Sequence, residues 1–278
     1  MKQMLKAALA AAMIVGTVQV SHAQEMAAVA TASDSVVGHS GLTISGAVGL
    51  PLNPTANVPD AGGVRVQANY FDLGGEDAFD SSLKLYGIYA AGSISNRLEI
   101  SGGVEKLRAS SDLNVFEDAF DNSGVALGAK YQLYRSEGGD TFGAVGAGYS
   151  RALHKNSFVY AVGTHAFTVG ERAVFGHLGL RYDRFEIDGA GLDLDSSKVS
   201  VFAGAEVPID RRGRFNLVGE IQSKNANDDL AGSTPYSLSL RYQTPRGLAA
   251  SVGIARQGVL ADALDDDNGL FAQIGYTF

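Results

Sequence analysis

The chain has 278 residues, a formal net charge of −8, and neither cysteine nor tryptophan. The acidic balance argues against a nucleic-acid partner, and without cysteine neither a disulfide framework nor a cysteine-anchored lipoprotein can form. Glycine is frequent, at 35 residues, which disfavours helices and is tolerated where strands curve closely.

The first 23 residues have the pattern of a secretory signal peptide. Two lysines precede an apolar stretch, and Ser21-His22-Ala23 gives a small-x-small cleavage site. The apolar stretch is too short to span a bilayer as a helix. No later apolar run is long enough for a transmembrane helix either. A mature protein that spans a membrane must therefore do so as a closed β-barrel, the other structure that satisfies all backbone groups in lipid.

Residues 24–63 are predicted to be a flexible leader with a Pro-rich segment, and this leader is a candidate plug for the barrel that follows. Residues 24–40 are mostly small, and residues 41–50 alternate enough to form a short strand. Three of the six prolines lie in residues 51–63. Proline removes a ladder donor and fixes φ, so this part is predicted to be a stiff, irregular link. An ordinary leader outside the barrel is the alternative.

From Val64 to the C-terminus the sequence has the two-residue period of β-strands. Most runs are 10–12 residues long, which suits tilted strands that span a membrane. The twelve runs cover about residues 64–71, 82–91, 97–107, 124–134, 141–151, 157–168, 173–185, 198–208, 213–222, 235–244, 247–257 and 269–278. Two of them, 82–91 and 157–168, are apolar on both faces. The alternative, a soluble β-sandwich, has strands of only about 5–6 residues.

The fold class predicted from these runs is all-β: a transmembrane, antiparallel up-and-down barrel of about 12 strands over residues 64–278. Its connections alternate in length, with short turns after the even-numbered runs. Short turns on one side and long loops on the other are typical of outer-membrane barrels, whose termini lie on the short-turn, periplasmic side. The long connections are predicted at residues 72–81, 108–123, 186–197, 223–234 and 258–268.

These long extracellular loops are acidic. Carboxylates are hard ligands for Mg²⁺ and Ca²⁺, but no stretch has the spacing of a calcium-binding loop, so no defined metal site is predicted. Two interpretations stay open. The loops are either solvated and mutually repelling, or divalent ions bridge them to the anionic headgroups of lipopolysaccharide.

The C-terminal run ends in a repeat of apolar residues at every second position. Leu270, Ile274, Tyr276 and Phe278 share one face of it. This pattern resembles the C-terminal signal of bacterial outer-membrane β-barrels, which the barrel-assembly machinery reads, with Tyr276 and Phe278 as the assembly signal. The resemblance implies a porin-like protein of the Gram-negative cell outer membrane, in contact with outer-membrane lipid and lipopolysaccharide.

A second resemblance covers about 25 residues near the start of the mature chain. Gly41-Leu42-Thr43, Pro54-Thr55-Ala56 and Asp60 to Val66 are similar to the opening of YjbH-type barrels. The resemblance implies a link to exopolysaccharide secretion.

The inner face of the predicted barrel carries charges of both signs. We expect nine of these side chains to line the lumen: Arg65, Glu99, Glu105, Lys130, His177, Arg181, Glu206, Glu220 and Arg241. Small residues in runs 141–151 and 247–257 are also expected to point inward. Two outcomes compete. Either the charges pair across the lumen and close it, because buried charges must be paired, or the small residues leave a narrow wet pore whose charges select solutes.

The predicted function is a porin-like channel or passive envelope component for small solutes. The alternatives are a barrel-embedded surface hydrolase that acts on lipid or peptide, and an export or adhesion barrel. Hydrolysis needs a nucleophile with an oriented base. The sequence offers His154 and His165 near the two ends of one run, with no acid fixed as their partner. We therefore predict no enzymatic activity, no cofactor and no metal.

Overall fold

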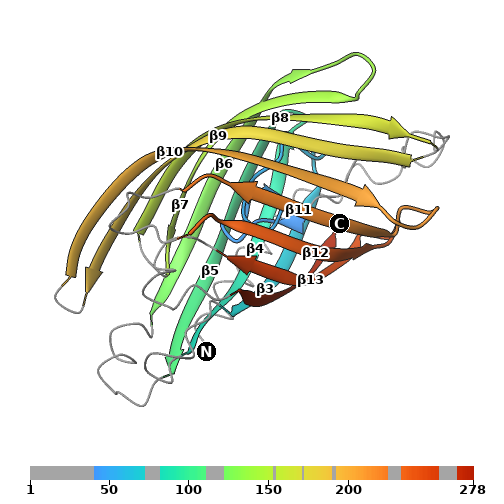
Figure 1. The fold of residues 1–278 in the computed structure, drawn as a ribbon. Coiled ribbons are helices and arrows are strands. Elements are labelled where there is room, and N and C mark those ends of the chain that lie inside the picture. The colour runs from blue at the N-terminus through green and yellow to red at the C-terminus, as the bar shows by residue number, and fades with distance from the viewer. Residues whose placement is uncertain are drawn as a thin grey trace.

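The computed structural model describes residues 41–72, 82–110, 122–152, 155–170, 172–189, 192–224, 233–256 and 268–278. Twelve antiparallel strands form a closed barrel in which each strand pairs with the next along the chain (Figure 1). The last strand pairs with the first through Phe271 and Phe71 at one end and Thr277 and Arg65 at the other. The predicted fold class is therefore confirmed. The predicted signal peptide and residues 24–40 lie outside the described residues.

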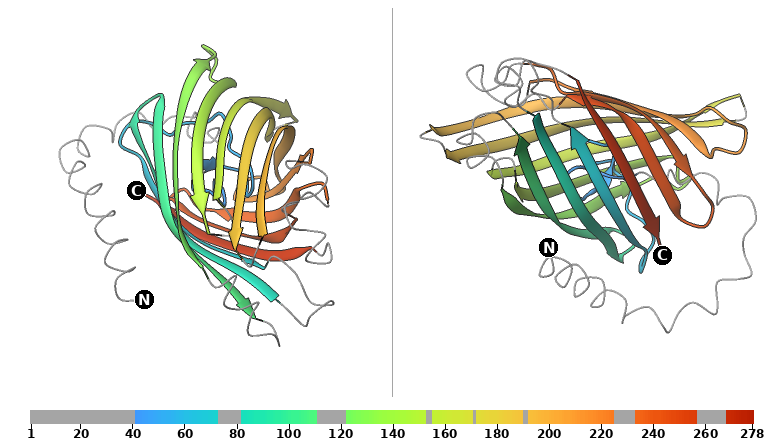
Figure 2. Two further views of the ribbon diagram at one scale, coloured as in Figure 1. Left: turned by 90° about the vertical axis from the view of Figure 1, so that its left-hand side faces the viewer. Right: turned by 90° about the horizontal axis from the view of Figure 1, so that it is seen from below.

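Each of the twelve predicted runs corresponds to one strand of the wall. The wall strands are β3 (Val64–Asp72), β4 (Ser82–Ser95), β5 (Leu98–Ser110), β6 (Ser123–Arg135), β7 (Thr141–Arg151), β8 (Lys155–Val169), β9 (Arg172–Gly189), β10 (Leu192–Pro208), β11 (Phe215–Gln222), β12 (Tyr236–Gln243), β13 (Leu248–Arg256) and β14 (Gly269–Thr277). They wrap obliquely around the lumen, as the two views in Figure 2 show.

One predicted connection is wrong. Residues 186–197 are not a long loop, because β9 and β10 remain paired as far as Gly189 and Leu192. Glu186 and Asp195 face each other across this ladder, which places like charges together. Arg184 Nη2 lies 3.3 Å from a carboxylate oxygen of each, so a shared cation lets the acidic hairpin continue. Most of the other acidic residues predicted for the long loops lie outside the described residues.

The short turns are tight and locally hydrogen-bonded. Gly139 and Gly213 have φ of 68° and 63°, a left-handed conformation that glycine adopts without strain. Beside the first, Asp140 accepts a hydrogen bond from the Ser136 hydroxyl at 2.6 Å. This bond, with a second from the Thr141 hydroxyl, lowers the pKa of the Asp140 carboxyl below its usual value.

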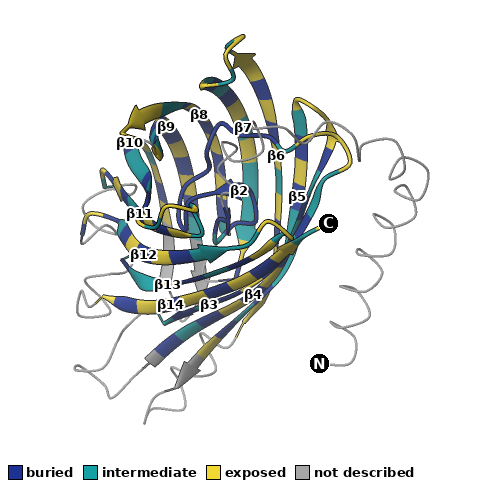
Figure 3. Cartoon of the chain, turned by 90° about the vertical axis from the view of Figure 1, so that its right-hand side faces the viewer, coloured by how far each residue is buried: buried dark blue, intermediate teal, exposed yellow. Residues whose placement is uncertain are grey.

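Burial alternates along the wall strands, as the bands of Figure 3 show. In β14, Leu270 and Ile274 are exposed at 61% and 58%, whereas Phe271 and Gln273 are buried. The exposed set is apolar around the whole barrel, and it includes Tyr276 and Phe278, whose rings pack edge to face. A closed ladder with an apolar outer face is the structure that lipid tolerates. Among the described residues, no helix has the length and hydropathy needed to cross a membrane.

Inward-facing glycines make room for aromatic rings that lie flat against the wall. A Cβ at Gly146 would lie 2.4 Å from the ring of Tyr160, and one at Gly148 would lie 2.3 Å from the ring of Phe158. The space that these small residues leave is therefore filled by side chains of the neighbouring strand. Small residues at these positions do not leave a wet pore.

We expect Gly146→Val to destabilise the barrel by about 1–3 kcal/mol, the usual cost of overpacking. The new side chain meets both the Tyr160 ring and the carbonyl oxygen of Ala129, 2.7 Å from the Cβ position, and the backbone cannot move aside cheaply. Urea unfolding, followed by the shift of the folded band on an unheated gel, measures the loss. Gly163→Val is the matched control, because the atoms nearest to a Cβ at that position are 3.9 Å away. Equal stability of both variants would contradict the packing argument.

Candidate functional site

Residues 41–58, which we call the inner segment, lie inside the barrel. Two short strands, β1 (Gly41–Leu42) and β2 (Val48–Gly49), pair with each other in this segment, and β2 appears within the ring of wall strands in Figure 3. Every residue from 41 to 58 except Ile44 is buried. The segment hydrogen-bonds to side chains of β3, β5, β6, β8, β11 and β14, so it contacts the wall on all sides.

Three residues of the inner segment have both main-chain polar groups bound to the wall. Gln67 accepts the Leu42 N–H at 2.9 Å and donates to the Leu42 carbonyl at 2.8 Å. Val48 N–H donates to Glu99, and its carbonyl accepts from Lys130. In a sheet, a neighbouring strand would bind these main-chain N–H and carbonyl groups. Here, side chains of the wall bind them instead.

The third residue bound in this way is Ala56. Its N–H donates to the Thr164 hydroxyl at 3.0 Å, and its carbonyl accepts from Gln132 Nε2 at the same distance. A further anchor, Glu220, accepts the N–H groups of Leu52 and Asn53 at 2.7 and 3.0 Å. The Glu220 carboxylate also accepts from Asn53 Nδ2 and, at 2.6 Å, from the Ser237 hydroxyl, so it is surrounded by donors.

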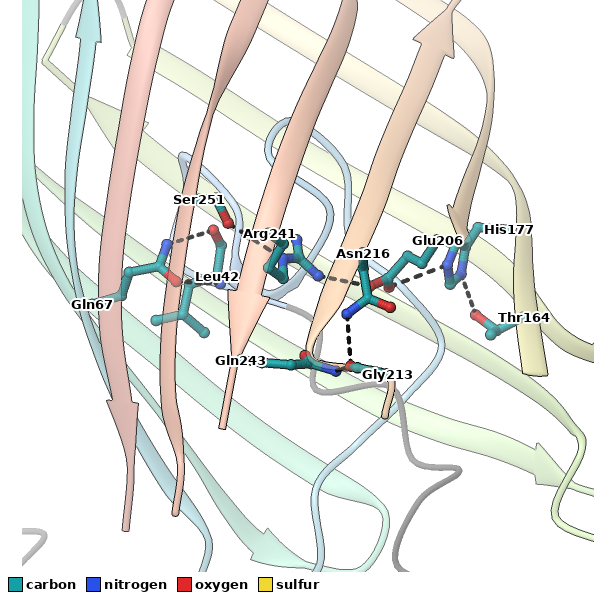
Figure 4. Close-up of polar contacts among 10 residues, drawn as sticks. All are labelled: Leu42, Gln67, Thr164, His177, Glu206, Gly213, Asn216, Arg241, Gln243 and Ser251. Carbon is teal, nitrogen blue, oxygen red and sulfur yellow. Dashed lines mark hydrogen bonds and ion pairs between the residues drawn. The ribbon is translucent and has the colours of Figure 1, made fainter. Parts of the chain in front are cut away.

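The charges of the wall are paired behind these contacts. Lys130 Nζ lies 2.9 Å from Glu99 Oε2, with both side chains buried. Arg241 donates to Glu206 at 2.7 Å, and Glu206 lies 3.4 Å from His177 Nε2 (Figure 4). A buried ion pair of this kind costs much of its Coulomb energy in desolvation, so its main effect is to fix side-chain positions.

His177 connects this ion pair to the inner segment. Its Nδ1 lies 3.0 Å from the Thr164 hydroxyl (Figure 4). The Thr164 hydroxyl also accepts the Ala56 N–H, so this one wall side chain joins the inner segment to His177.

Apolar side chains of the wall also pack against the inner segment. Leu52 packs with lumen-facing residues near the long-loop end of the wall, where the rings of Phe71 and Phe271 stack at 5.1 Å. Ala56 packs against a second cluster that includes Phe158, Tyr160 and Phe202. Runs 82–91 and 157–168 look apolar on both faces because one face meets lipid and the other meets these clusters.

All nine predicted lumen-lining residues are buried. The structure brings Lys130 to Glu99 and joins Arg241, Glu206 and His177. Arg181 binds Asp183 instead, at 2.8 Å, and its guanidinium lies 4.0 Å from the centre of the Phe158 ring.

The two remaining predicted lumen residues hydrogen-bond to side chains of the wall. Glu105 accepts from the Tyr89 hydroxyl, and Arg65 donates to Thr277. Three further residues contact the inner segment, Gln67, Gln132 and Thr164, and they are not among the nine residues expected to line the lumen. Alternation places them on the inner face, but nothing local indicates their partner.

The histidines considered for hydrolysis do not form a catalytic site in the described structure. His165 Nδ1 lies 2.7 Å from the Thr141 hydroxyl near the short-turn end of β8, away from the outer rim. His154 lies outside the described residues. Within the described part of the chain, no three His, Cys, Asp or Glu side chains are grouped as metal ligands.

A closed antiparallel barrel with an apolar outer face and a polar, charged lumen defines an outer-membrane β-barrel of the porin-like class. No protein-family model matches the sequence, and no curated protein matches it. Solved structures share the fold. The chain is 11% identical to the COG4313 outer membrane channel from Pseudomonas putida F1, with a TM-score of 0.57, over 82% of this chain and 100% of the other.

A second similar structure is the KdgM porin, with 10% identity and a TM-score of 0.50 over 77% of this chain and 99% of that chain. At these identities the likeness establishes the outer-membrane barrel fold. The predicted similarity of the N-terminal part to YjbH-type barrels is not shown by these comparisons.

Proposed function

We propose that this protein is a porin-like channel for small solutes whose lumen is closed by the inner segment until that segment moves. The observation that carries the proposal is that the wall is a complete barrel without the inner segment, which is held inside it by non-covalent contacts to side chains. A wall that carried no solute could fill an apolar lumen with its own side chains. This lumen instead keeps buried charged and amide groups that bind the segment, which is attached to the wall only through the link to β3.

The proposal extends to the surroundings of the barrel. Outer-membrane lipid and lipopolysaccharide contact the apolar outer face, and the barrel-assembly machinery reads Tyr276 and Phe278, which are exposed at 42% and 67%.

The absence of enzymatic activity stays a prediction. Assays of the purified protein against envelope lipid and peptide substrates test it, and an activity that His154→Ala or His165→Ala abolished would contradict the prediction.

We expect the wild-type protein to be nearly silent in planar bilayers and a variant without residues 41–58 to form a stable open pore. Removal of the segment frees polar groups that water can then solvate, and the wall ladder is untouched. Single-channel recording measures the conductance, and a salt-gradient reversal potential gives the ion preference. A deletion variant that is folded but electrically silent would refute the channel.

A disulfide lock tests the same movement without deletion. The Cβ position of Gly204 lies 2.3 Å from Leu50 Cδ1, so Leu50→Cys with Gly204→Cys brings two thiols close enough to bond after a small adjustment. The chain has no other cysteine. We expect the oxidised protein to remain closed and reductant to restore wild-type openings. Openings that are equally frequent in both states would show that the segment need not move.

A further inference from the structure

The wall binds the inner segment through the main chain of the segment. Leu42, Val48 and Ala56 each have N–H and carbonyl groups bound by wall side chains, at distances between 2.8 and 3.0 Å. Two further wall residues add to this set: Gln273 donates to the Leu42 carbonyl, and Asn69 donates to the Thr43 carbonyl. Main-chain groups are common to all peptides, so these contacts do not select a sequence.

The polar side chains of the inner segment are treated differently. Asn53 Oδ1, Thr55 Oγ1 and Asn57 Oδ1 are buried and have no hydrogen-bond partner within the described structure. Asn53 Nδ2, in contrast, donates to Glu220 of the wall. A buried polar group left unpaired destabilises the folded state. A binding site specific for this one sequence should supply hydrogen-bond partners to the side chains at least as completely as to the main chain.

We propose that the lumen is a binding site for polypeptide main chain, and that short peptides are the solute class of the channel. This inference rests on the proposed function, because a peptide can enter only when the inner segment has left. The wall then presents acceptors (Glu99, Thr164, Glu220) and donors (Lys130, Gln132, Gln273) that the segment had occupied. Glu99 and Lys130 form an acceptor–donor pair at Val48, and Thr164 and Gln132 form one at Ala56. At Leu42, Gln67 supplies both groups. Each of these three sites therefore matches the N–H and C=O of one amide residue.

Apolar pockets between these groups take side chains without specifying them. Leu52 and Ala56 occupy two such places, lined by phenylalanine, leucine and alanine. A pocket of this kind accepts apolar side chains of similar size and discriminates only weakly among them. The lumen therefore combines strict recognition of the amide with loose recognition of side chains.

Binding of a peptide added to the deletion variant tests the inference. Because the chain has no tryptophan, the fluorescence of a peptide that carries one reports its own binding in detergent, independently of conductance. The probes are the peptide of residues 41–58, the same composition in scrambled order, and the peptide N-methylated at Val48 and Ala56. A neutral oligosaccharide of similar length is offered as a competitor. If the deletion does not fold, the full chain with Leu52→Asp takes its place, because a charge in the apolar cluster around Leu52 disfavours the bound segment and leaves the wall intact.

We expect the first two peptides to bind within about tenfold of each other. N-methylation at the two sites should weaken binding at least tenfold, because each methyl group removes a donor to a buried acceptor. Equal binding of the N-methylated peptide, or stronger binding of the oligosaccharide, would overturn the inference. In bilayers, the unmodified peptides should also block the open pore. Peptide binding without conductance would refute the channel and leave the main-chain site standing.

Matched variants of the wall provide the second arm. Gln67→Ala and Gln132→Ala remove side chains that bind the segment backbone. Gln222→Ala removes an equally buried glutamine that donates to Ser200 of the wall instead. We expect the first two variants to weaken peptide binding about tenfold and the third to leave it unchanged. Equal losses in all three would mean that the glutamines act on the wall alone.

Discussion

Glu220→Gln is expected to release the inner segment from β11 and to raise the open probability of the channel by at least tenfold. The Glu220 carboxylate accepts two main-chain N–H groups, the Asn53 amide and the Ser237 hydroxyl. Glutamine has the same shape, but its NH₂ group must face donors on one side. Each donor left unpaired in a buried site costs about 1–3 kcal/mol, and the cost is avoided when the segment leaves.

Conductance of the full-length variant in planar bilayers measures this effect. Glu105→Gln is the matched control, because Glu105 is an equally buried lumen carboxylate whose described partner is Tyr89 on the wall. The control channel should stay closed. If Glu220→Gln is as silent as Glu105→Gln while both fold, Glu220 does not hold the segment in place.

Lys130→Met is expected to destabilise the barrel by about 3–5 kcal/mol, because it leaves the buried Glu99 carboxylate without its cation. Both side chains are almost completely buried, and Lys130 also donates to the Val48 carbonyl. The loss therefore acts on the wall and on the anchor of the inner segment together. Urea unfolding in detergent gives the free energy, and the wild-type slope checks that the same surface is exposed.

A double variant separates charge from packing. Glu99→Gln keeps an oxygen that can accept the Val48 N–H and removes the unpaired charge. Lys130→Met with Glu99→Gln should therefore recover most of the stability that Lys130→Met alone loses, and the double-mutant cycle gives the coupling between the two groups. Additive losses would show that the pair contributes little beyond its separate contacts.

The wall of this protein is predictable from its sequence because lipid imposes a simple rule on it. Every second residue of a wall strand faces lipid and must be apolar, as Leu270, Ile274 and Tyr276 are. This two-residue period can be recognised in the sequence without knowing which strands pair. The number of strands, the fold class and the inner set follow from that rule. Residues 186–197 were misjudged because composition alone does not show that Arg184 offsets the facing acids.

The interior is less predictable, because its contacts join distant parts of the chain. Glu220 meets Leu52 across 168 residues, and Gln132 meets Ala56 across 76. Nothing near Glu220 in sequence distinguishes it from Glu105, yet one binds the segment and the other binds the wall. The inward-facing glycines are a second example. The sequence suggests that Gly146 and Gly148 leave space in the lumen, but the rings of Tyr160 and Phe158 on the neighbouring strand fill it.

Leu42 also bears on how the molecule is assembled. Its carbonyl accepts hydrogen bonds from Gln67 on β3 and from Gln273 on β14, which is 231 residues further along the chain. These two strands are the first and the last wall strands in the sequence. The seam between them and the full set of bonds to Leu42 thus become complete in one event. Contacts of such high sequence separation form late and slowly. The wall therefore closes around an inner segment that is already covalently joined to β3, and the segment does not have to enter a finished barrel.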